Sequence, residues 1–143
     1  MLNGRAVIRL EVPGILTHRD VALRTVSAAC KLVRGKPGGA RPDANFSLHV
    51  VSAVGEAFNN IALHGYGGRL SDIIRVEIDV GDDAITIAIH DFGSSFDPAA
   101  AVPPDLDTLP ESGLGVYIIR SFMDTVDYRP GRPNVLTLTK HIN

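Results

Sequence analysis

Hydrophobic and polar residues alternate along several segments of the chain, as they do in β-strands with one buried face. In Ile73–Val80 the even positions are apolar and the odd ones from Arg75 onward are charged. Gly81-Asp82-Asp83 then predicts a turn and Ala84–His90 a second strand, so the two form a hairpin. Further strands are predicted over Arg5–Val12, Thr125–Arg129 and Val135–His141.

A different period, with apolar residues three and four apart, predicts helices between these strands. The longest helix is expected over Phe46–His64, where Gly65 and the residues after it end the pattern. A helix capped by Thr17 is expected to run to about Val33, and a third covers Gly113–Met123. Arg34–Asn45 is rich in Gly and Pro and predicts a loop.

The predicted order is β-α-α-β-β-α-β-β, in which strands come in consecutive pairs. This order favours an α+β fold, a two-layer α/β sandwich with a mixed, mainly antiparallel sheet and helices on one face. The chain of 143 residues is the length of one domain, so residues 1–143 are expected to form a single domain.

Composition narrows the function classes. The formal net charge of −2 gives no overall basic field for nucleic acid or an anionic membrane. A single cysteine, Cys30, excludes an internal disulfide, and its apolar surroundings indicate a buried hydrophobic residue rather than a catalytic thiol. With no signal peptide and no apolar run that could cross a bilayer, a cytoplasmic location is expected.

Glu56, Asn60 and His64 are spaced four apart, which places them in one line on the long helix. This stripe alone fits a solvated helix face as well as a binding site. Asn60 could ligate Mg²⁺ through its amide oxygen, and Glu56, one turn away, could accept a proton from an attacking hydroxyl. A metal-ligand role for His64 is disfavoured, because no second His or Cys has suitable spacing.

Two later segments favour the binding site. Asp91 and Gly93 directly follow a strand, where an acid and a close backbone approach suit a ligand. Gly113 and Gly115 open a helix, whose free N–H groups favour phosphate. The intervening Asp91–Ser112 is long and rich in proline, which is typical of a functional loop such as a lid.

These segments resemble the GHKL, or histidine-kinase-like, ATPase superfamily. The stretch Glu56-Ala57-Phe58-Asn59-Asn60-Ile61-Ala62-Leu63-His64-Gly65-Tyr66 is similar to its N box, and Asp91-x-Gly93-x-x-Phe96 and Gly113-Leu114-Gly115 are similar to the next two boxes. The match is closest to anti-sigma regulatory factors that are serine-protein kinases of the RsbW type. The tail Asn134-x-Leu136-x-Leu138-x-Lys140 also fits that group.

The resemblance implies a Bergerat ATP-binding fold, with ATP and Mg²⁺ as ligands. It implies Asn60 as the magnesium ligand, Glu56 as the general base and Asp91 as the acceptor for the adenine amino group. Residues 91–112 would form the ATP lid. The remaining implied nucleotide-binding residues are Gly93, Phe96, Gly113, Leu114, Gly115 and, beneath the adenine, Thr137. His64 is included with them, in a structural or phosphate-proximal role near the helix end. Arg120 and Lys140 are expected to be surface charges rather than phosphate ligands.

The implied function is a protein serine/threonine kinase that phosphorylates a STAS-type anti-sigma factor antagonist and binds a sigma factor by another surface. A homodimer is expected from the resemblance alone. The lid has several acids but no Lys or Arg, unlike lids that use a base near the phosphates. A binding switch without turnover therefore stays open, as does a stand-alone ATPase domain of a sensory system.

Overall fold

The computed structural model describes residues 5–65, 72–95 and 114–142. Five strands form one sheet: β1 (Ala6–Pro13), β2 (Ile73–Val80), β3 (Ala84–Asp91), β4 (Thr125–Arg129) and β5 (Asn134–His141). Their order across the sheet is β1-β2-β3-β5-β4, and every neighbouring pair is antiparallel. The predicted α+β class is confirmed, and the sheet of the described residues is wholly antiparallel rather than mixed.

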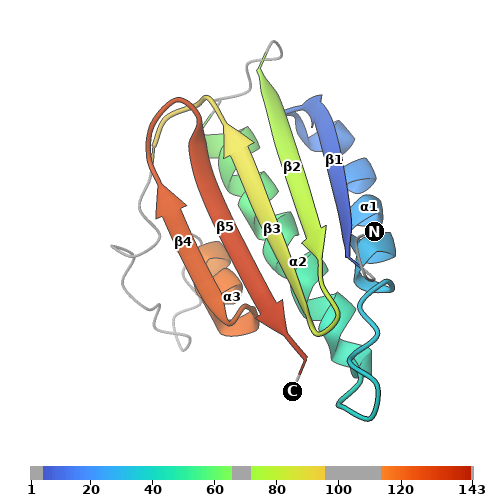
Figure 1. Ribbon diagram of the computed structural model, residues 1–143. Coiled ribbons are helices and arrows are strands. Elements are labelled where there is room, and N and C mark those ends of the chain that lie inside the picture. The colour runs from blue at the N-terminus through green and yellow to red at the C-terminus, as the bar shows by residue number, and fades with distance from the viewer. Residues whose placement is uncertain (1–4, 66–71, 96–113, 143) are drawn as a thin grey trace.

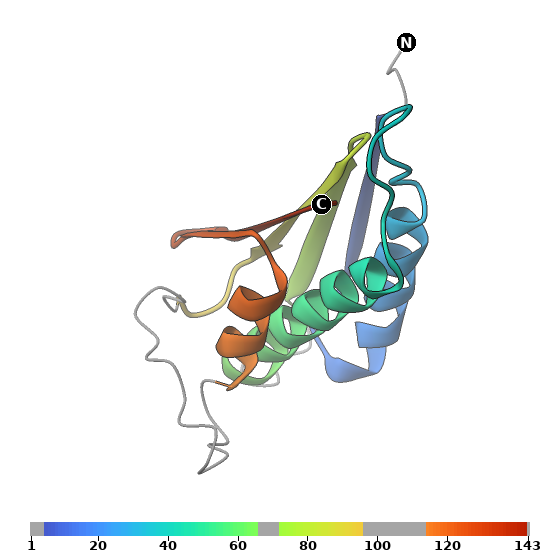
Figure 2. The same cartoon turned by 90° about the horizontal axis from the view of Figure 1, so that it is seen from below.

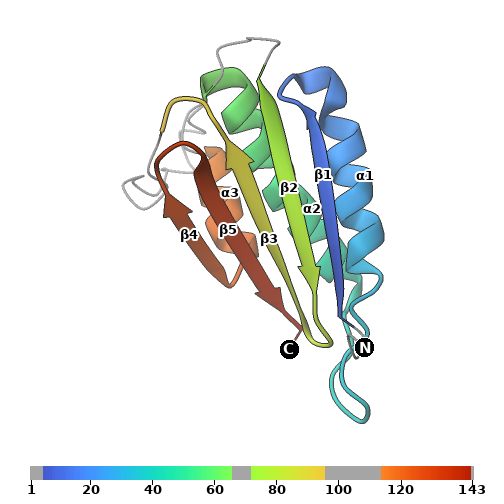
Figure 3. The same cartoon turned by 45° about the horizontal axis from the view of Figure 1, so that its top comes forward.

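Three α-helices cover one face of this sheet (Figures 1 and 2). These are α1 (Arg19–Cys30), α2 (Ala44–Asn60) and α3 (Leu114–Phe122). Helix α1 lies behind β1, α2 behind the middle strands and α3 behind β5 and β4 (Figure 3). The molecule thus has the two layers that the element order predicts.

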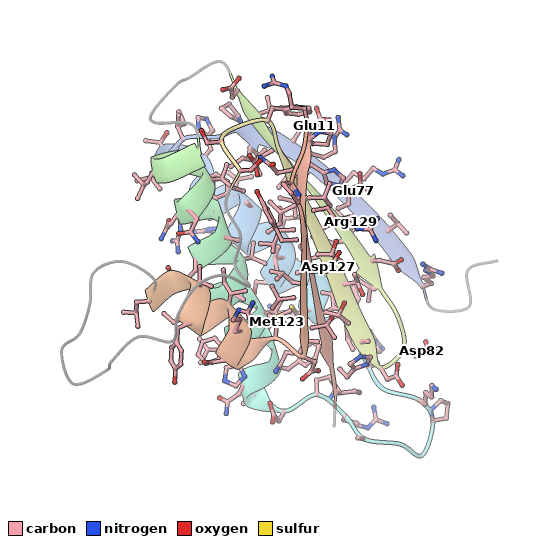
Figure 4. All side chains as sticks on the ribbon, turned by 90° about the vertical axis from the view of Figure 1, so that its left-hand side faces the viewer. Glu11, Glu77, Asp82, Met123, Asp127 and Arg129 are labelled. Atoms are coloured by element: carbon pink, nitrogen blue, oxygen red, sulfur yellow. The ribbon has the colours of Figure 1, made fainter. Side chains whose placement is uncertain are left out.

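Strand alternation decides which side chains enter the core. In β2 and β3 every second residue is buried, so that Ile74, Ile78 and Ile87 face the helices. On the helix side the core includes Val26, Val50 and Phe58. Figure 4 shows Met123 between α3 and the sheet, whereas Glu77, Asp127 and Arg129 project from the opposite face. That second face carries charged and polar side chains and no helix among the described residues.

The starts of α1 and α2 differ from the sequence prediction, and α1 ends at Cys30 rather than near Val33. Thr17 does not cap the first helix; it lies in a short 3-10 helix, Leu16–His18, and α1 begins after it. Helix α2 begins earlier than predicted because Asp43 caps it, its Oδ1 accepting from the Asn45 N–H at 2.9 Å. None of the helices in the described ranges is long and apolar enough to span a membrane.

Cys30 is buried at the end of α1, as predicted. Burial raises the pKa of its thiol, and contact with the Ser47 hydroxyl offsets this only in part. A thiol whose pKa is raised is seldom a thiolate near neutral pH, so Cys30 is a structural residue of the α1–α2 interface.

Candidate nucleotide site

Glu56 and Asn60 lie near the end of α2, in its last two turns. The helix spacing of four places Asn60 one turn beyond Glu56 on the same face. Both side chains are partly exposed, whereas Ala57 and Phe58 between them are buried in the core. The core residues hold α2 against the sheet, and the carboxylate and the amide lie on the side of α2 that meets α3.

The start of α3 lies directly over these two side chains. A methyl group on Gly115 would lie 2.8 Å from Glu56 Oε2 and 3.6 Å from Asn60 Oδ1. These distances bring Gly115 next to a pair of residues more than 50 positions earlier in the sequence. They also show why glycine suits position 115, since a Cβ there would displace the Glu56 carboxylate. Leu114 is the first residue of α3 and lies beside this contact.

Helix α1 contacts α2 at the residue that precedes Glu56. The guanidinium of Arg19 occupies the space that a Cβ on Gly55 would fill, and its Nε donates to the Gly55 carbonyl at 3.4 Å. Gly55 therefore permits a close approach of the two helices. This contact fixes the backbone next to Glu56.

Asp91 ends β3 and is only 3 % exposed. The β3–β5 register places it directly opposite Asn134, the first residue of β5. Asp91 Oδ1 accepts from the Gly93 N–H at 2.9 Å and from Asn134 Nδ2 at 3.0 Å. A buried carboxylate needs such donors, and they hold this one in a single orientation.

Asn134 is fully buried and joins three segments of the chain. Besides Asp91, its Nδ2 donates to the Gly93 carbonyl at 3.0 Å. Its Oδ1 accepts from Ser95 Oγ at 2.6 Å and from the Gly131 N–H at 2.9 Å. The amide thus uses both its donors and its acceptor to fix the segment after β3 against the turn before β5.

Asn134 was not among the predicted site residues, although a sequence signal pointed to it. Leu136 and Leu138 alternate on the buried face of β5, and the same period places Asn134 on that face. A polar side chain on an apolar face needs a partner, and Asp91 at the end of the neighbouring strand provides it. The register that pairs them is a tertiary feature.

Thr137 was predicted to lie beneath the adenine. It lies on β5 opposite Ala88, at a position that alternates with the buried Leu136 and Leu138. Its side chain is therefore on the face of the sheet away from the helices and from Asp91. Asn134, three residues earlier, takes the place beside Asp91.

His64 belongs to a π-helical segment, Ile61–Gly65, that continues α2. Because a π-helix has a wider turn, the four-residue spacing that aligns Glu56 with Asn60 does not continue in the same way to His64. The prediction for its side chain lies outside the described part of the structure. So do the predictions for Phe96, Gly113 and lid residues 96–112.

The described groups suit a magnesium ion that arrives with its substrate. No group of three or more His, Cys, Asp or Glu side chains within residues 5–65, 72–95 and 114–142 could hold a metal on its own. Asn60 Oδ1 and the Glu56 carboxylate are oxygen donors at one place beside the start of α3. Mg²⁺ characteristically takes one or two protein oxygens and completes its shell with water and phosphate.

The Asp91 cluster and the Glu56–Asn60 pair lie at the same end of the molecule, where β3 ends, β5 begins and α2 ends (Figures 1 and 3). Asp91 offers a buried hydrogen-bond acceptor there, and Glu56 and Asn60 offer oxygen ligands beside the start of α3. The arrangement can bind a ligand with a hydrogen-bond donor at one end and phosphates at the other.

Comparison with known proteins agrees with this geometry. Residues 20–140 match the histidine kinase-like ATPase domain family. An anti-sigma F factor of Clostridium beijerinckii is 34 % identical over 103 residues, which cover 66 % of this chain and 70 % of that protein. A serine-protein kinase RsbW of Staphylococcus aureus is 33 % identical over 99 residues, covering 63 % and 62 %.

A similar fold occurs in the histidine kinase domain of the Erythrobacter litoralis blue-light activated histidine kinase. The TM-score is 0.57 at 14 % identity, and the match covers 92 % of this chain and 62 % of that one. At this identity the likeness concerns the fold alone. The family match extends over most of the chain, including α2, the end of β3 and β5. The chain therefore belongs to the histidine kinase-like ATPase domain family.

Proposed function

We propose that this protein is a Mg-ATP-binding anti-sigma regulatory factor that acts as a protein serine/threonine kinase in a partner-switching system. The observation that carries the proposal is the contact of Gly115 with Glu56 Oε2 and Asn60 Oδ1. It gathers a proton acceptor, a cation ligand and a helix start, which are the parts that phosphoryl transfer needs. The relatives named as anti-sigma F factor and serine-protein kinase RsbW supply the substrate class.

In this proposal Asp91 binds the adenine. Its Oδ1 is engaged by Gly93 and Asn134, which leaves Oδ2 to accept from the exocyclic amino group. Gly93 lets the base lie close to the backbone. The start of α3, with Leu114 and Gly115, lies beside the phosphates and provides N–H donors.

The transfer step follows from the position of Glu56. The hydroxyl oxygen of a Ser or Thr on the protein substrate attacks the γ-phosphorus, and the bond from that phosphorus to the β–γ bridging oxygen breaks. ADP leaves with the electron pair, and the hydroxyl proton passes to Glu56. Asn60 would hold Mg²⁺, which neutralises phosphate charge when bound.

The proposed protein substrate is a STAS-type anti-sigma factor antagonist, and the proposed alternative partner is a sigma factor. Phosphorylation of the antagonist would decide which of the two is bound. A homodimer is part of the same proposal, and sedimentation equilibrium tests it. A single species of 15.3 kDa at micromolar concentration would contradict the dimer.

The decisive experiment incubates the protein with γ-labelled ATP and a candidate antagonist. Glu56→Ala is expected to lower transfer by about 10²- to 10⁴-fold while ATP binding is retained. Ser52→Ala, one turn earlier on α2, is the matched control and should transfer normally. Normal transfer by Glu56→Ala would refute the general-base role.

Calorimetry tests the nucleotide site separately. Asn60→Ala and Asp91→Asn should each weaken Mg-ATP binding by about 100-fold or more, which corresponds to about 2.7 kcal/mol. Asn59→Ala is the control, because Asn59 is a neighbour on α2 without the four-residue spacing from Glu56. Unchanged affinity in both site variants would overturn the assignment.

A second candidate function is an ATP-dependent interaction switch without turnover. The observation that favours it is the lid sequence 91–112, which has acids but no Lys or Arg to contact the γ-phosphate. Binding of Mg-ATP without transfer to any antagonist would support the switch. Transfer that depends on Glu56 would exclude it.

A further inference from the structure

A pocket lies at the end of the helix layer opposite to Glu56, Asn60 and Asp91. It has a volume of about 190 Å³ and is formed where α2 begins and β5 ends. Figure 1 shows these two ends at the bottom of the molecule, whereas β3 ends at the top. The residues lining the pocket are Arg41, Asp43, Phe46, His49, Lys140, His141 and Ile142. None of them belongs to the nucleotide site.

The lining is cationic, although the whole chain has a net charge of −2. Arg41 and Lys140 contribute a guanidinium and an ammonium group, and His49 and His141 add two imidazoles. The only carboxylate of the lining is Asp43, and its Oδ1 is already engaged as the cap of α2. A local excess of positive charge beside a helix start favours an anion over a cation or an apolar ligand.

Two of these basic side chains are held in place by α3. Lys140 Nζ donates to the Phe122 carbonyl at 2.7 Å at the end of that helix. The His49 ring stacks on the Phe122 ring, with centroids 4.3 Å apart and planes inclined by 11°. The Lys140 ammonium and the His49 imidazole are therefore oriented before a ligand arrives, which lowers the entropy cost of binding.

The size of the pocket limits the ligand. A volume of about 190 Å³ corresponds to about six water molecules, at roughly 30 Å³ each. Sites for drug-sized ligands or nucleotides occupy roughly 300–1,000 Å³. The pocket therefore suits one oxyanion group with a short stem and is smaller than a typical nucleotide site.

We propose that this pocket is a second ligand site, which binds a single oxyanion group of phosphate or carboxylate type. Arg41 and Lys140 neutralise its charge, and His49 and His141 donate further hydrogen bonds. The oxyanion belongs to a free small anion or to an acidic side chain of a bound peptide. The proposal rests on the pocket alone and does not depend on the proposed nucleotide site.

The test follows the imidazole signals of His49 and His141 by NMR in the full chain. The probes are inorganic phosphate and, separately, a tetraglutamate peptide, at constant ionic strength. Saturable shifts of both imidazoles with one of the probes are expected. Saturation by phosphate identifies a small-anion site, and saturation by the peptide alone identifies a docking site for acidic side chains.

Arg41→Gln should weaken the saturable binding at least about 10-fold, because the exposed guanidinium carries charge but few structural contacts. Arg129→Gln removes the same charge from β4, far from the pocket lining, and should bind like the parent protein. Linear shifts with both probes, or equal affinity of the Arg41→Gln and parent proteins, would overturn the proposal. Thermal unfolding checks that each variant is folded.

Discussion

Helices α2 and α3 are in contact at both ends of their shared face, but the side chains at the two ends suit different ligands. At one end Gly115 of α3 approaches Glu56 of α2, and at the other Phe122 stacks on His49. The two contacts lie seven residues, or two turns, apart on each helix. The later residue of α3 meets the earlier residue of α2, so the helices run antiparallel with one face in contact. The distance between the ends is about 10 Å along the axis.

The difference between the ends lies in the size and charge of the residue on α3. Glycine leaves space beside a carboxylate and an amide, which suits a cation and phosphates. Phenylalanine fills the space and fixes a cationic surface next to it, which suits an anion. One helix of nine residues, Leu114–Phe122, thereby contributes to both proposed sites.

The largest effect is expected from Asn134→Ala at the nucleotide end. The substitution removes one of the two donors to the buried Asp91 carboxylate and leaves the Gly131 N–H without its acceptor, which should cost about 3 kcal/mol of folding free energy. The expected fall in Tm is roughly 10 °C, together with weaker ATP binding. Thr137→Ala, on the same strand but the opposite face, should change stability by less than about 0.5 kcal/mol. Equal melting curves for the two variants would contradict the network.

Gly115→Ala is expected to act on transfer rather than on stability. The added methyl group pushes the Glu56 carboxylate aside, which is easy because the contact is the far end of a flexible side chain. A displacement of about 1 Å can lower transfer by up to about 100-fold. Phosphoryl-transfer assays on this variant and on Gly81→Ala, a glycine in the β2–β3 turn, make the comparison. Full activity of Gly115→Ala would show that the carboxylate position is not critical.

A smaller effect is expected at the other end of α3. Lys140→Met keeps the apolar stem and removes the hydrogen bond to the Phe122 carbonyl, so it should lower stability by about 1 kcal/mol. Chemical denaturation measures the change, with His141→Gln as the control in the same pocket lining. If Lys140→Met left the free energy of unfolding unchanged, α3 would not need this anchor.

The smallest effect is expected from an ion pair between the start of β1 and strand β2, which belongs to neither end of the α2–α3 helix pair. The Arg5 guanidinium donates to the Asp79 carboxylate and holds the pKa of Asp79 below its usual range, outweighing the opposite effect of partial burial. Because the folded pKa is depressed, the pair stabilises the fold above about pH 4 and loses this effect as the pH falls through the folded pKa. Asp79→Asn should lower Tm by at most about 1 °C at pH 7 and by nothing near pH 2. A Tm difference between Asp79→Asn and the parent protein that grew on acidification would contradict this assignment.

Much of the fold could be predicted from local patterns. The alternation of apolar and polar residues predicted β2, β3 and β4 with few boundary changes, because one face of each strand packs toward the core. Glu56 and Asn60 were found by the same reasoning, since a helix aligns residues four apart wherever it lies. The beginning of α2 was missed because capping by Asp43 depends on a loop without periodicity.

The sequence by itself therefore determined the order of the elements, the Glu56–Asn60 pair and Asp91 at a strand end. Only the tertiary structure decided that Asn134 rather than Thr137 meets Asp91, because strand register is set by pairing between segments more than 40 residues apart. It also decided that Gly115 lies over Glu56 and that Lys140 and His49 join Arg41 around one pocket. Such contacts depend on how α2, α3 and β5 pack together, and no local period along the chain encodes that packing.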